Sequence, residues 1–150
     1  MKRIPHGSSC LARAHKWTLL AASLFIALTG FVWMAAHYAM LFFPDIDGIP
    51  LRSAMHSILI GHGVLAYGGA ILLGSLIGRH IPAGLRRPRK AMSGIVSLVL
   101  VSLLIVTALF LYYAPTRELH QMASQAHQAV GVICVAAIVR HITVWGRRKR

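Results

Sequence analysis

The sequence predicts an all-α fold: one integral membrane domain over residues 1–150, built as a four-helix bundle with both termini in the cytoplasm. The first observation is composition, since 57% of the residues are hydrophobic and only 13% are charged, a balance that water-soluble domains do not show. The second is a set of four long uncharged stretches, at residues 17–43, 53–78, 91–114 and 119–139. A helix that crosses a bilayer needs about 20 apolar residues, and each stretch reaches that length.

Local signals mark the ends of the predicted helices, which cover residues 17–43, 53–80, 91–114 and 117–145. Prolines follow the first three: Pro44 opens a tight outer turn, Pro82 leads into a short basic loop, and Pro115 ends the third helix. Thr116 can cap the fourth helix, and Glu118 in its first turn favours the same start. The connections are too short to hold a separate soluble domain.

The basic residues are divided unevenly between the two sides of such a bundle. Of the 16 Lys and Arg residues, 14 lie in the N-terminal tail, the loop between the second and third helices, and the C-terminal end. Since positively charged loops stay in the cytoplasm, we expect a multi-pass protein of the bacterial inner membrane with both termini inside. We expect no nucleic-acid partner, because the charges behind the +13 balance flank apolar helices.

Histidines are nearly the only ionisable residues inside or beside the apolar stretches. His127 and His141 are 14 residues apart on the fourth helix, almost four turns, so their rings share one face about 21 Å apart. The interval from His62 to His80 on the second helix corresponds to about five turns, so these two rings also share one face. A histidine inside a membrane helix is costly and usually functional.

Two helices that each carry an outer and an inner histidine suit two haems stacked across a bilayer. Imidazole nitrogen is an axial ligand of haem iron, and two facing histidines fill both axial positions, which favours electron transfer. By depth, the outer pair is His62 with His127 and the inner pair is His80 with His141. No Cys-x-x-Cys-His motif occurs in the sequence, so we expect non-covalent haem.

Four further histidines remain alternative ligands: His120, His56, His37 and His15. His120 precedes His127 by seven residues and lies on almost the same face, so it can replace His127 or bind a propionate. His56 lies about 120° around the helix from His62 and is a rival outer ligand. His37, near the outer end of the first helix, is another, and His15 competes for the inner site.

A faint internal repeat accompanies the histidines. Arg79-His80-Ile81 closes the second helix, and Arg140-His141-Ile142 closes the fourth. Thr29-Gly30 in the first helix and Thr107-Ala108 in the third lie at comparable depths. A duplicated two-helix hairpin would give the second and fourth helices equivalent roles.

The sequence resembles the small bacterial b-type cytochrome family over about residues 29–141. The shared features are four helices, histidine pairs on the second and fourth helices, and the segment Tyr112-Tyr113-Ala114-Pro115 at the end of the third helix. Relatives of this family include cytochrome b membrane subunits of respiratory oxidoreductases. The resemblance implies two non-covalent haems b and electron transfer between quinone and a redox partner. We expect any enzymatic activity to be that of an electron-transfer component of an oxidoreductase, in an oligomer or a larger complex. The resemblance rests on four residues: His62, His80, His127 and His141.

One departure and two rival functions remain open. The His62 to His80 gap spans about 27 Å against about 21 Å on the partner helix, so tilt or unwinding near Pro82 must absorb the difference. A cofactor-free membrane scaffold or assembly protein would leave the inner histidines as interfacial residues. A transition-metal protein is the other rival, since imidazole suits zinc, copper and nickel, but the membrane core offers no acid and a single cysteine, Cys134.

Overall fold

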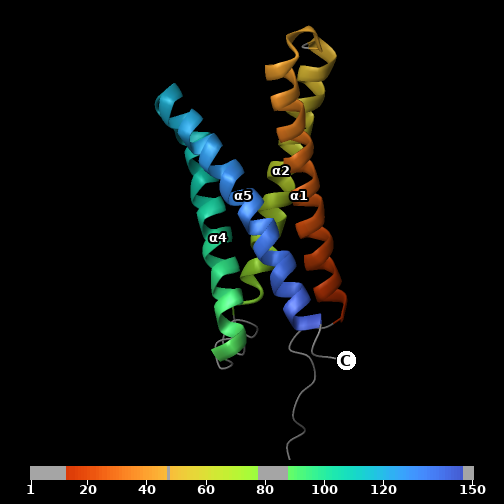
Figure 1. The fold of residues 1–150 in the computed structure, drawn as a ribbon, viewed down its shortest axis with the longest axis vertical. Helices are drawn as coiled ribbons and strands as arrows, with labels where there is room; N and C mark the ends of the chain where they lie inside the picture. The colour runs from red at the N-terminus through yellow and green to blue at the C-terminus, as the bar shows by residue number, and fades with distance from the viewer. Residues whose placement is uncertain (1–12, 47, 78–87, 147–150) are drawn as a thin grey trace, which may run out of the picture. The chain divides into compact units, whose positions relative to one another are not determined.

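The computed structural model describes residues 13–46, 48–77 and 88–146 of the chain. In these residues the fold is all-helical (Figure 1). Its elements are α1 (Arg13–Phe42), the short 3₁₀ helix η1 (Pro44–Ile46), α2 (Ile49–Gly74), α4 (Pro88–Tyr113) and α5 (Arg117–Gly146). All four α-helices are long and apolar enough to cross a membrane, which confirms the predicted all-α class and suggests a multi-pass membrane protein.

The chain divides into two compact units, residues 1–83 and 84–150, called here the first and second hairpin. In the first hairpin α1 packs against α2, and in the second α4 packs against α5 (Figure 1). Each pair is joined by a short connection, so its two helices run in opposite directions. A residue early in one helix therefore lies beside a residue late in the next.

The second helix differs at both ends from the predicted range 53–80. It begins at Ile49, because Pro50 occupies the first turn, where its missing N–H costs no hydrogen bond. It ends at Gly74. The next residues form a tighter turn, with the Leu76 N–H bonded to the Leu73 carbonyl at 2.9 Å and the Ile77 N–H to Gly74 at 3.1 Å. The remainder of the predicted helix, residues 78–80, lies outside the described residues.

The start of the fourth predicted helix is as expected. The Leu119 N–H donates to the Thr116 hydroxyl at 3.2 Å, and the His120 N–H donates to the Thr116 carbonyl at 3.1 Å. Thr116 therefore caps α5, and Glu118 lies in its first turn. This cap fixes where α5 begins and hence the depth of each histidine along it.

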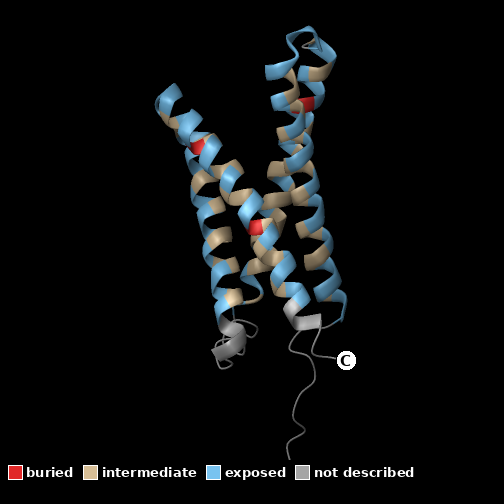
Figure 2. Ribbon diagram, in the orientation of Figure 1, coloured by how far each residue is buried: buried red, intermediate tan, exposed pale blue. Residues whose placement is uncertain are grey.

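Most apolar side chains of the two hairpins are not covered by their own helices (Figure 2). Among the described residues the buried apolar side chains are Met55, Ala123 and Cys134. Large apolar residues stay open on the helices, such as Tyr67 at 75% and Leu109 at 54% exposure. The free energy of burying apolar surface is favourable by about 25 cal/mol per Å². An apolar environment such as a lipid bilayer would therefore stabilise these exposed faces.

Candidate functional site

In the first hairpin, His62 on α2 lies against Thr29 on α1. The Thr29 hydroxyl oxygen is 3.0 Å from Nδ1 of His62, and both residues are half-buried. The same oxygen lies 2.9 Å from the Phe25 carbonyl and 3.0 Å from the Ile26 carbonyl, the usual acceptors for a threonine within a helix. The Thr29 hydroxyl therefore joins the α1 backbone to the His62 ring.

Glycines let the two helices of the first hairpin approach closely at His62 and about two turns further along α2. A methyl group added at Gly30 would lie 3.2 Å from Cε1 and 3.6 Å from Nδ1 of His62, so the ring rests almost against the α1 backbone. One added at Gly69 would lie 2.8 Å from the end of the Ile26 side chain. Small residues at such positions allow close helix packing in membranes. The ring position is thus set by backbone contact as well as by hydrogen bonds.

The second hairpin repeats this arrangement with Thr107 on α4 and His127 on α5. The Thr107 hydroxyl oxygen is 2.8 Å from Nδ1 of His127. It also lies 2.9 Å from the Leu103 carbonyl and 3.1 Å from the Leu104 carbonyl. The two carbonyls stand four and three residues before the threonine, as Phe25 and Ile26 do before theirs. Both hairpins therefore carry the same threonine–histidine contact.

A second contact between a hydroxyl and a histidine lies further from the turn of the second hairpin, near the start of α4 and the end of α5. Ser93 precedes Thr107 by the same interval that separates His127 from His141. The Ser93 hydroxyl lies 2.9 Å from Nδ1 of His141. A methyl group added at Gly94 would lie 3.7 Å from Cε1 of His141. Both histidine rings thus face α4, as their spacing of nearly four turns predicts for one helix face.

The first hairpin also has a contact between a serine and a histidine, but there the histidine lies on the first helix of the hairpin and the serine follows the second helix. Here the histidine is His15 on α1, which precedes Thr29 by that same interval, and the hydroxyl is Ser75, just after α2. The Ser75 oxygen lies 3.0 Å from Nε2 of His15 and donates to the Leu72 carbonyl. Contact at Nε2 rather than Nδ1 distinguishes His15 from the other three histidines. His80, the sequence-based choice for the inner ligand, lies outside the described residues.

The remaining alternative ligands are exposed and lie in other surroundings. His37 stacks on Trp33 with ring centroids 5.0 Å apart and planes 7° apart, and it meets the edge of Tyr38 at 5.4 Å. His56 lies near the start of α2, and His120 lies in the first turn of α5 beside its cap. The structure thus brings hydroxyl partners to His15, His62, His127 and His141.

Sequence reasoning placed Thr29 and Thr107 in a faint repeat but missed all four hydroxyl partners, Thr29, Ser75, Ser93 and Thr107. One signal could have found most of them, because the same spacing recurs from His15 to Thr29, from Ser93 to Thr107 and from His127 to His141. Interhelical hydrogen bonds in membranes contribute only about 0.6 kcal/mol on average. These contacts therefore do more to orient the imidazole rings than to stabilise the hairpins.

The chemistry that these rings can support is that of imidazole nitrogen held in a fixed orientation. Within the described residues no three His, Cys, Asp or Glu side chains gather around one point that could hold a metal ion. Haem iron, in contrast, accepts single imidazole nitrogens as ligands, so histidines that are each oriented by a hydroxyl group fit its donor set. Comparisons with protein-family models, curated proteins and solved structures found no match for this chain.

Proposed function

We propose that the chain is a membrane electron-transfer protein that binds two non-covalent b-type haems through histidine pairs and passes electrons between quinone and a redox partner. The observation that carries this proposal is the contact between threonine and a half-buried histidine, repeated in both hairpins at His62 and His127. Such histidines are costly in a membrane helix. Histidine ligands of metal centres are commonly held by a hydrogen bond at their other ring nitrogen, and a threonine hydroxyl lies at Nδ1 of both residues.

In this proposal the outer haem is held by His62 and His127. The two residues occupy equivalent positions, since each follows the turn of its hairpin and faces a threonine of the preceding helix. A bound haem supplies reversible one-electron chemistry at its iron. The histidines would hold and orient it. Held by two imidazoles, the haem would support electron transfer rather than binding of oxygen.

The inner haem is held by His141 and by one histidine of the first hairpin. The contact between Ser93 and Nδ1 of His141 supports His141 in this role, because it repeats the contact made by His127. For its partner the candidates are His80, at the depth that sequence spacing gives, and His15, which has a serine contact of its own. Using Nε2 of His15 would require its ring to turn away from Ser75.

The purified full-length protein, produced in haem-replete bacteria, is expected to be red. Its reduced-minus-oxidised spectrum should be that of low-spin b haem, because two imidazoles complete the coordination of the iron. The haem should pass into acidified organic solvent, since no covalent attachment motif exists. A colourless protein would contradict the proposal, and zinc or copper in its place would favour the transition-metal alternative.

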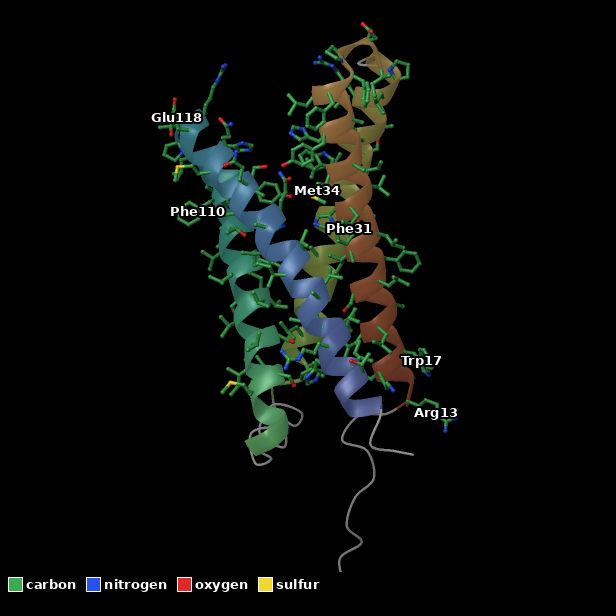
Figure 3. The ribbon with its side chains drawn as sticks, viewed as in Figure 1. Arg13, Trp17, Phe31, Met34, Phe110 and Glu118 are labelled. Carbon is green, nitrogen blue, oxygen red and sulfur yellow. The ribbon has the colours of Figure 1, made fainter. Side chains whose placement is uncertain are left out.

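The proposed location is the bacterial inner membrane, with lipid as the surrounding partner. Arg13 and Trp17 lie together at the start of α1 (Figure 3), and the Lys16 ammonium is 5.9 Å from the centre of the Trp17 ring. Basic and aromatic residues of this kind anchor the cytoplasmic end of a membrane helix. Glu118, at the start of α5, belongs to the opposite, outer side in this topology.

Reporter fusions are expected to place both termini and the 83–90 loop in the cytoplasm, and residues near Gly48 and Arg117 outside. The expected result follows from the 14 basic residues on one side and the two on the other. The measurement is the activity of a reporter that works only inside or only outside the cell. A C-terminus outside would mean that one of the four apolar helices does not cross, and the inner and outer sites would be wrongly assigned.

A further inference from the structure

Thr29 and Thr107 each place one hydroxyl between the backbone of their own helix and the Nδ1 atom of a histidine on the neighbouring helix. A hydroxyl has a single proton to donate. In both residues two backbone carbonyls lie within 3.1 Å of the oxygen, and a helical threonine gives its proton to such a carbonyl. The oxygen then has only lone pairs left to offer the imidazole. It acts as a hydrogen-bond acceptor.

An accepting oxygen 3.0 Å or 2.8 Å from Nδ1 requires that this nitrogen carry the ring proton. If Nδ1 bore a lone pair instead, two lone pairs would face each other at hydrogen-bond distance. A neutral imidazole has one N–H and one lone pair. The lone pair of both rings therefore belongs to Nε2.

We propose that Thr29 and Thr107 are positioning residues that fix the Nδ1–H tautomer of His62 and His127 and make Nε2 the nitrogen that binds haem iron. The inference rests on the proposed function and adds to it the residues that tune the two ligands. By accepting the Nδ1 proton, each hydroxyl makes the imidazole more basic. A more basic ligand stabilises the oxidised iron, so both threonines hold the outer haem at a lower midpoint potential.

The test uses isosteric variants of the full-length protein in bilayers. Thr107→Val and Thr29→Val remove the acceptor and keep the shape of the side chain, whereas Thr107→Ser and Thr29→Ser keep the hydroxyl. Thr18→Val is the matched control, because the Thr18 hydroxyl bonds the Ala14 carbonyl of its own helix at 3.1 Å. Three quantities are measured: the midpoint potential of each haem, the retention of each haem, and the nitrogen NMR shifts of isotopically labelled histidine in the reduced, diamagnetic protein.

Each valine variant is expected to raise the midpoint potential of one haem, leave the other unchanged and weaken retention of the affected haem about tenfold or more. The Nδ1–H resonance of the facing histidine should move to the position of a weaker hydrogen bond. Serine should restore all three quantities, and Thr18→Val should change none. A structural role alone would affect stability but would move neither the potential nor the nitrogen resonance.

The inference and the proposed function fail in different ways. A wild-type protein with two haems, but with potentials and nitrogen resonances unchanged in both valine variants, would overturn the inference and leave the function standing. A wild-type protein without haem would overturn the function, and its own nitrogen spectrum would still decide the tautomer. In that spectrum, His62 and His127 protonated at Nε2 would overturn the inference. This last reading needs no variant, so a variant that fails to fold does not remove the test.

Discussion

His127→Ala is expected to remove the outer haem and leave the inner one, so that the haem content of the purified protein falls by half. His127 lies within α5, is held at Nδ1 by Thr107, and is the histidine of the second hairpin whose contacts repeat those of His62. Without its imidazole the proposed outer haem would lose one of the two residues that hold it. His62→Ala should give the same partial loss, because it removes the opposite ligand of the same haem.

Two matched controls accompany these variants. His120→Ala changes an exposed histidine two turns earlier on α5, and His56→Ala changes an exposed histidine on α2; both should keep the full haem content. Two haem equivalents and an unchanged spectrum in His127→Ala would mean that the ligand lies elsewhere, with His120 as the first alternative. Loss of haem in His56→Ala but not in His62→Ala would give His56 the ligand role on α2.

His141→Ala is expected to remove the inner haem, again halving the haem content, with the outer haem retained. The reason is the Ser93 contact at Nδ1, which orients this ring as Thr107 orients His127. The haem removed must differ from the one lost in His127→Ala, which the midpoint potential of the remaining haem will show. If both variants lose the same haem, the two histidines do not serve separate sites.

Comparison of His15→Ala with His80→Ala then identifies the partner of His141. The ligand variant should reproduce the loss seen in His141→Ala, and the other should keep both haems. If neither single variant loses haem, neither His15 nor His80 is the partner of His141, and the proposed inner haem site is wrong.

The all-α class was predictable from the length and composition of the uncharged stretches. Each of the four stretches corresponds to one helix, α1, α2, α4 or α5, and each of these helices is long and apolar enough to cross a membrane. The bounds of α2 were predicted less well. At its start, Pro50 suggested a turn, although the first turn of a helix accommodates proline. At its end, the regular helix stops at Gly74, before Ser75, which is earlier than the apolar pattern implied.

The candidate site was predictable only as far as single helices determine it. A spacing of nearly four turns places His127 and His141 on one face without knowledge of any other helix. The hydroxyl partners could not be predicted in this way, because the contact between Thr29 and His62 depends on the register of α1 against α2. That register follows from where α1 ends, from the start of α2 at Ile49 and from close packing at Gly30 and Gly69.

The measurement that tests the central claim most directly is the ratio of haem to protein in the purified, full-length chain from haem-replete bacteria. Haem is determined as its pyridine complex after extraction, and protein by amino-acid analysis of the same sample. The proposed pairs of histidines predict two b-type haems per chain. A ratio near zero would contradict the assignment of these histidines as haem ligands, and a ratio of one would contradict the presence of separate outer and inner sites.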